Sequence, residues 1–160
     1  MSPAAIAGAR VSAPNELMTI ERVAVLKRVA LFGEVPGHTL VAVARLLEEV
    51  SFEAGDTILH RGAVEDWLFV VAEGRIRVHI GEMTLLENGP GGVVGEFALL
   101  APAPRSASAT AVEPSLLLRL RRGPFEELLD DHPEIARAVI STLARMLQTS
   151  ADNRAETAGA

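Results

Sequence analysis

The sequence lacks cysteine and tyrosine, and it has only one tryptophan and five phenylalanines. Without cysteine it can form no disulfide or thiolate metal site, and it has no thiol nucleophile. Its net charge of −6 leaves no broad basic surface, so we expect no nucleic-acid partner. No apolar run approaches the length that spans a bilayer, and we expect no membrane span. These absences favour a globular protein, for which we expect a cytoplasmic location.

The length of 160 residues allows one domain, whose core falls mainly to valine, leucine, isoleucine and alanine because aromatic residues are few. We expect this domain over residues 16–148. The Ala-rich stretch 1–15 has no signal-peptide pattern and is predicted to be a disordered tail. The polar stretch 149–160 is predicted to be disordered as well. No repeat, coiled coil or helix-turn-helix pattern is present.

The hydrophobic pattern divides the domain into helices, short strands and helices again. Apolar residues at helical spacing predict helices over 16–30 and 36–49. From Val50 to residue 122, short apolar segments alternate with glycine-bearing turns, which is typical of an antiparallel β-roll or sandwich. The predicted strands are 57–60, 67–72, 75–80, 83–86, 106–112 and 115–120. Helices return over 123–148, so the predicted fold class is α+β: a jelly-roll-like antiparallel roll flanked by helices.

One glycine-bounded stretch inside the roll contains residue types that suit the binding of a ligand. Gly95 frees the backbone just before Glu96, and the apolar turn that follows could present unpaired N–H groups to an anion. Arg105, after two prolines, carries a guanidinium fork that suits a phosphate diester. Ser106 adds a hydroxyl beside it. An acid, an arginine, a hydroxyl and free amides would together suit a ribose joined to one phosphate.

The runs Gly95-Glu96-Phe97-Ala98-Leu99 and Pro104-Arg105-Ser106-Ala107 resemble the phosphate-binding cassette of the cyclic nucleotide-binding domain family. This family includes catabolite activator proteins, regulatory subunits of cAMP-dependent kinase and nucleotide-gated channels. The resemblance implies that Arg105 pairs with the cyclic phosphate and that Glu96 accepts from the ribose 2′-hydroxyl. It also implies that backbone amides from Gly95 to Ala98 and at Ser106 complete the cradle.

By the same resemblance, the C-terminal helix would cover the base and would signal by moving. Its lid or base contacts would come from Leu143, Met146 and Leu147, with Ser108 as a further contact. We therefore expect a stand-alone regulatory domain that binds cAMP, or else cGMP, with no metal and no other cofactor. It would act on an unknown effector protein, and the apolar stripe of the last helix could form a homodimer.

Two other classes of function compete with this interpretation. An enzyme would need a nucleophile with its base or an acid–base pair, and Ser106 has no evident histidine partner. A protein–protein module could keep the fold and lose the nucleotide, since fold does not fix function. Gly91-Gly92-Val93-Val94, which departs from the family's frequent G-D-x-F, keeps that alternative open. Arg119, Arg121 and Arg122 are interpreted as a solvated strand end, and Trp67 as a packing residue.

Overall fold

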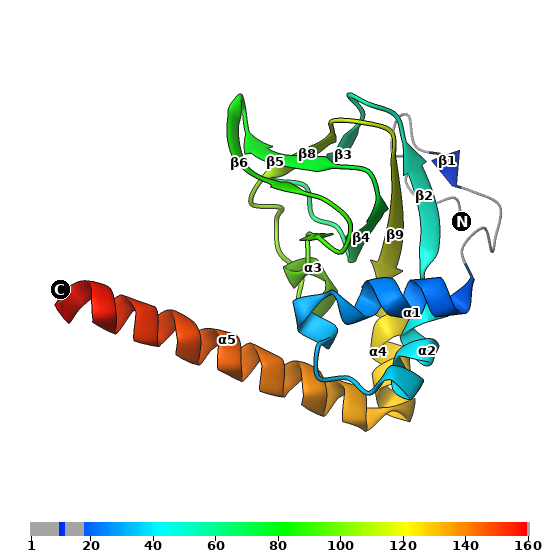
Figure 1. Cartoon of the computed structure of the whole chain (residues 1–160), viewed down its shortest axis with the longest axis vertical. Helices are drawn as coiled ribbons and strands as arrows, with labels where there is room; N and C mark the ends of the chain where they lie inside the picture. Colours follow the sequence, from blue (N-terminus) through cyan, green and yellow to red (C-terminus); the bar gives the residue numbers. More distant parts are fainter. Residues whose placement is uncertain (1–9, 12–17, 160) are drawn as a thin grey trace.

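The chain folds into two antiparallel sheets with helices gathered against one of them (Figure 1). The computed structural model describes residues 10–11 and 18–159. The first sheet has the strand order β1-β2-β9-β4-β7, and the second has the order β3-β8-β5-β6. This mixture of helices and antiparallel strands confirms the predicted α+β class and the β-roll. The predicted tail at 1–15 lies outside the described residues apart from 10–11.

The strands follow the glycine-bearing turns that the sequence predicts. Gly74, for example, begins the turn that connects β4 in the first sheet to β5 in the second, with a φ of +101°, which L residues rarely adopt. The strands are β1 Arg10–Val11, β2 Glu48–Phe52, β3 Thr57–Leu59, β4 Trp67–Glu73, β5 Ile76–Ile80, β6 Met83–Asn88, β7 Val93–Val94, β8 Ser108–Ala111 and β9 Ser115–Arg121. Six of these overlap the predicted strands, whereas β1, β2 and β7 were not predicted.

The N-terminal helices are shorter than their sequence pattern predicts. Helix α1 covers Thr19–Lys27, the 3-10 turn η1 covers Ala30–Phe32, and α2 covers Gly37–Ala44. The sequence pattern predicts a second helix over 36–49, but α2 ends at Ala44 and the chain enters β2 at Glu48. Pairing of β2 with β9 satisfies the backbone of these residues in a sheet, and Val50 and Phe52 become buried in the roll. Tertiary pairing therefore overrides the helical spacing there.

Two apolar clusters share the first sheet between them. One face of β4 and β9, with Leu68, Val70 and Leu118, packs against the helices and includes the edge-to-face pair Phe32–Phe125. The opposite face, with Phe69 and Leu117, packs inside the roll. Alternation of side chains along a strand produces these two faces. The sheet is therefore buried on both sides.

The C-terminal helices are α4, Arg122–Asp131, and α5, Pro133–Gly159. Helix α5 continues through the stretch 149–159 that the sequence analysis assigns to a disordered tail. This stretch contains no proline and has alanines at 151, 155 and 158, so no helix breaker stops it before Gly159. Only the first part of α5 packs on the domain; the rest extends away as an arm (Figure 1).

Candidate functional site

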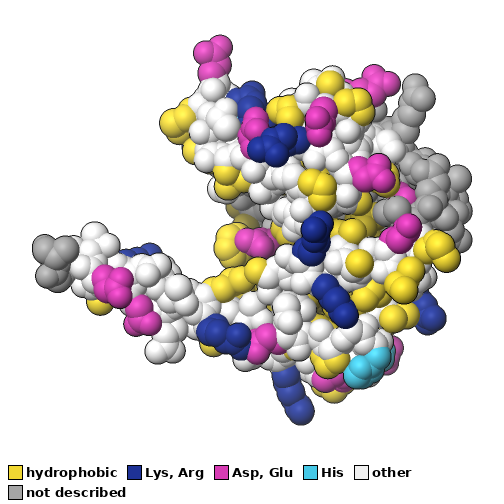
Figure 2. Space-filling model, in the orientation of Figure 1, with side chains coloured by type: hydrophobic (Ala, Val, Ile, Leu, Met, Phe, Trp, Pro, Cys, Tyr) yellow, Lys and Arg dark blue, Asp and Glu magenta, His cyan; other side chains and the backbone are white. Residues whose placement is uncertain are grey.

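A pocket of about 530 Å³ opens at the stretch that the sequence analysis singles out. Its wall consists of residues 93–98 and 103–109 together with Leu59, Val78, Leu86 and Asn88 from the roll. Among these lining residues, only Glu96 and Arg105 carry charge. Figure 2 shows the surface hollowed between the roll and the α5 arm, with hydrophobic side chains beside the hollow. The pocket thus combines an apolar wall with one acid and one base.

The glycine before the acid allows a close backbone approach. Gly95 has a φ of +77°, and a Cβ placed on it would lie 2.1 Å from Nη1 of Arg105. A side chain at this position would therefore meet both backbone strain and the guanidinium. Glu96 then leads into the helix α3, Phe97–Leu100, in which the side chains of Ala98 and Leu99 are buried. Gly95 brings the start of α3 directly over Arg105.

Arg105 is buried and held by three acceptors of the protein. Its Nε donates to Oε1 of Glu65 at 3.1 Å, Nη1 donates to the Gly95 carbonyl at 3.0 Å, and Nη2 donates to the Trp67 carbonyl. A guanidinium has five N–H groups, so these bonds leave one N–H on each Nη. N–H groups on the two Nη atoms of a guanidinium can bond the two free oxygens of a phosphodiester. The orientation of Arg105 is thus fixed before any ligand arrives.

Glu96 lies in the same pocket without a cation beside it. Burial raises the pKa of its carboxyl above the ordinary value, since removal from water disfavours the charged form. A hydroxyl donor at this position would restore part of the lost hydration. The arrangement can therefore bind a hydroxyl group at Glu96 and an anionic group at Arg105.

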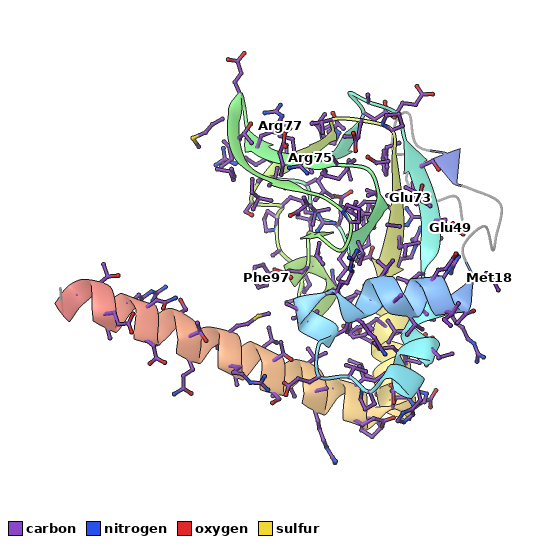
Figure 3. All side chains as sticks on the ribbon, in the orientation of Figure 1. Met18, Glu49, Glu73, Arg75, Arg77 and Phe97 are labelled. Atoms are coloured by element: carbon purple, nitrogen blue, oxygen red, sulfur yellow. The ribbon has the colours of Figure 1, made fainter. Side chains whose placement is uncertain are left out.

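The other predicted cassette residues have different surroundings. Phe97 is 70% exposed and points away from the roll on the side of the α5 arm (Figure 3). The Ala98 amide donates to the Gly95 carbonyl at 3.2 Å, whereas the amides of Glu96 and Phe97 precede the first turn, where a helix offers no acceptor. Ser106 is exposed in the pocket wall, and Ser108 accepts from the Arg61 amide at 3.0 Å.

The predicted lid residues lie away from the pocket. Leu143, Met146 and Leu147 are absent from its lining, although Leu143 packs at the edge of the helical core. Met146 and Leu147 are 41% and 72% exposed on the arm of α5. The structure thus brings Gly95, Glu96, Phe97, Ala98, Arg105, Ser106 and Ser108 together around one pocket and leaves the three α5 residues outside it.

Sequence reasoning missed the residues behind the pocket. Glu65, in the loop before β4, and the carbonyl of Trp67, the first residue of β4, hold Arg105 from 40 and 38 residues earlier in the chain. Arg122 donates through Nε to the Ala98 carbonyl at 2.8 Å, which ties α3 to the start of α4. No local motif marks these contacts, because each joins a side chain to a distant backbone carbonyl or to a loop carboxylate.

The arginines at the end of β9 correct one prediction. Arg119 is 2% exposed, so it is not part of a solvated strand end. Its guanidinium lies 5.5 Å from the centre of the Trp67 ring, and Arg121 lies 5.9 Å from the same ring. Both arginines pair with Glu48. Trp67 is buried, as expected of a packing residue, and it holds these two cations by cation–π contact.

Comparison with known proteins shows which family the chain resembles. A family model described as "Cyclic nucleotide-binding domain" matches residues 49–132, a little over half of the chain. A CRP-like cAMP-activated global transcriptional regulator of Mycobacterium tuberculosis is 27% identical over 137 residues, which cover 82% of this chain and 61% of that protein. The chain spans 61% or less of the first curated relatives.

Solved structures give the same result. The N-terminal domain of a transcriptional regulator from Streptomyces coelicolor is 32% identical, with a TM-score of 0.76 over 81% of this chain and 94% of that one. The regulatory domain of Toxoplasma gondii PKA, solved with cAMP, is 28% identical, with a TM-score of 0.65 over 74% of this chain and 47% of that one. In the described part of this chain, no helix has both the length and the apolar character needed to cross a membrane.

Proposed function

Because the chain belongs to the cyclic nucleotide-binding domain family, we propose that it is a regulatory domain whose pocket binds a cyclic mononucleotide, with cAMP favoured. The carrying observation is that Arg105 is buried, oriented by three acceptors and left with one free N–H on each Nη. A cyclic phosphodiester has one negative charge and two free oxygens, which this pair of donors fits.

Glu96 supplies the second recognition element. In the proposed complex its carboxylate accepts a hydrogen bond from the ribose 2′-hydroxyl, while the base lies against the apolar wall formed by Leu59, Val78 and Leu86. A 2′-deoxy analogue would leave the partly buried carboxylate without its donor, so it should bind more weakly. The amides at the start of α3 and at Ser106 would complete the phosphate contacts.

Signalling is proposed to occur through α5. The beginning of the helix is anchored by Ile135 and Val139 in the core and by Thr142 and Arg145 on Glu34. Beyond Arg145 the arm carries Met146 and Leu147, whose side chains are exposed. The arm extends from the domain on the side where Phe97 is exposed (Figures 1 and 3). Ligand binding would favour a state in which these apolar groups meet, a shift between existing conformations. The same stripe could instead form a homodimer or bind an effector protein.

Calorimetric titration of the purified protein with cAMP, cGMP and a cyclic dinucleotide tests this function. We expect binding of cAMP, weaker binding of cGMP and no binding of the dinucleotide. Ser106→Ala should weaken both mononucleotides similarly if the hydroxyl contacts the phosphate, whereas a loss confined to cGMP would place the hydroxyl on the base. Tighter binding of cGMP would overturn the preference for cAMP.

A protein-interaction module without a ligand is the second candidate. It is favoured by one observation: Glu65, Gly95 and Trp67 already provide acceptors for Arg105, so protein groups hold the buried guanidinium in place without a ligand. The same titration separates the two functions. A folded protein that binds no mononucleotide at millimolar concentration would support the interaction module.

A further inference from the structure

The charge of the phosphate cradle depends on an acid that does not line it. Arg105 and Glu96 are the two charged groups among the lining residues, and Glu65 lies behind Arg105. Glu65 accepts from Nε, whereas the N–H groups without a protein acceptor are on Nη1 and Nη2. Counting Arg105 and Arg122, which bonds the Ala98 carbonyl, against Glu96 and Glu65, these four side chains carry no net formal charge. A negatively charged ligand therefore meets a guanidinium whose charge is already offset by Glu65.

The surroundings make this compensation effective. The Arg105 side chain is 4% exposed and that of Glu65 is 21% exposed, so water screens their interaction only in part. Glu65 belongs to the loop just before β4, where Trp67 also holds Arg105 through its carbonyl. Two neighbouring contacts thus fix the loop against the guanidinium. The Glu65 charge consequently stays at a constant position relative to any anion bound at Arg105.

We propose that Glu65 is a positioning residue that makes the site select singly charged phosphodiesters over doubly charged phosphomonoesters. This inference rests on the proposed function and adds a specificity determinant to it. A cyclic phosphate carries one negative charge, whereas the ring-opened monoester carries nearly two at neutral pH. Repulsion by a fixed carboxylate scales with the ligand's charge, so the monoester suffers about twice the penalty in free energy. The domain would then release its ligand once the cyclic ester is hydrolysed.

The substitution Glu65→Gln separates charge from geometry. Glutamine keeps an oxygen that can accept from Nε of Arg105 and removes only the negative charge. We expect it to bind cAMP roughly five- to tenfold more tightly than the wild type, the effect of one unit charge several ångströms away in a partly screened site. The gain for 5′-AMP should be about the square of the gain for cAMP, so the preference for the cyclic ester narrows about five- to tenfold.

Calorimetry at one pH and two salt concentrations measures these affinities. Glu126→Gln, an exposed change on α4, is the matched control for the loss of one negative charge and should change neither ligand. Glu65→Asp keeps the charge and should keep the wild-type discrimination between the two esters. High salt should reduce the gains of Glu65→Gln, because they are electrostatic. A merely structural role would weaken both ligands alike in Glu65→Gln and would leave their ratio unchanged.

Two kinds of failure can be told apart. If the wild type binds cAMP and Glu65→Gln binds it no more tightly, or leaves the ratio of the two esters unchanged, the inference about Glu65 is wrong. If the wild type binds no nucleotide, the proposed function is wrong, and inorganic phosphate followed by ³¹P NMR still tests Glu65. Tighter phosphate binding by Glu65→Gln would then support the inference, and equal, weaker or undetectable binding would overturn it.

Discussion

Arg105→Ala is the most direct perturbation of the site, and the structure gives two separate magnitudes for it. The substitution removes the two N–H groups that are free for a ligand. A hydrogen bond to a charged group contributes about 1.5–3 kcal/mol. We therefore expect cyclic nucleotide affinity to fall by at least that amount, roughly tenfold to more than a hundredfold.

The same substitution also affects folding. It leaves the carbonyls of Gly95 and Trp67 and the carboxylate of Glu65 without their donor. Each unsatisfied buried acceptor costs about 1–3 kcal/mol, reduced where water enters the space of the lost side chain. We expect the free energy of unfolding to fall by roughly 2–4 kcal/mol. Urea unfolding of the ligand-free protein measures this loss independently of binding.

Arg105→Lys is the control that separates the two effects. Lysine keeps the positive charge but cannot bond Glu65, two carbonyls and a phosphate in the planar geometry of a guanidinium. It should be more stable than the alanine variant and still bind cyclic nucleotide more weakly than the wild type. Calorimetry is done only where urea unfolding shows that the variant is folded. A folded Arg105→Ala protein whose affinity lies within twofold of the wild type would refute the assignment of Arg105 to the phosphate.

Three further perturbations follow from the same structure. Gly95→Ala should lower the free energy of unfolding by about 1–2 kcal/mol through backbone strain, which urea unfolding measures. It should also weaken ligand binding tenfold or more, because the added Cβ displaces the Arg105 guanidinium. Unchanged binding would contradict the close approach of Gly95 to Arg105. Burial raises the pKa of Glu96, so ionising its carboxyl costs more free energy in the folded chain than in the unfolded chain, and stability falls as the pH rises through the carboxyl range. Glu96→Gln should therefore be more stable than the wild type at pH 7 but not in acid; equal unfolding curves at pH 7 would contradict this. A chain ending at Arg145 keeps the core contacts of Ile135, so it should stay folded. It should bind cyclic nucleotide several-fold more weakly than the full chain, as calorimetry would measure. Wild-type affinity would exclude a lid formed by residues beyond Arg145.

The roll could be predicted because its signals are local. Glycines at turns and apolar segments between them mark most of the strands, and the six predicted strands overlap those of the structure. The strand β2 could not be predicted in this way, because Leu47 and Val50 continue the helical spacing of α2, and the chain enters a strand at Glu48 only by pairing with β9. The two-residue strand β7 is set by its pairing with β4. Non-local pairing, which the sequence pattern does not encode, determines both.

The burial of Arg119 illustrates a second limit. A charged residue near a strand end reads as solvated, because an isolated buried cation is unfavourable. Here Glu48 lies opposite Arg119 in the register of β2 and β9, and the Trp67 ring lies against its guanidinium. The acid, the ring and Arg119 come from three strands that are far apart in the chain. The cation is tolerated in the interior because the sheet brings the acid and the ring to it.

The candidate site likewise has residues that local sequence signals identify and a residue that only a non-local contact identifies. Glu96 and Arg105 face the pocket from one continuous stretch, so their spacing in the sequence identifies them. Glu65 bonds Nε of Arg105 from a loop forty residues earlier and does not line the pocket, and nothing in its own neighbourhood distinguishes it from a surface acid. A motif records the groups that touch a ligand, whereas the charge that the ligand meets is the sum over everything packed behind them. Two domains with identical cassettes can therefore differ in affinity and in their tolerance of a second phosphate charge through one residue outside the motif.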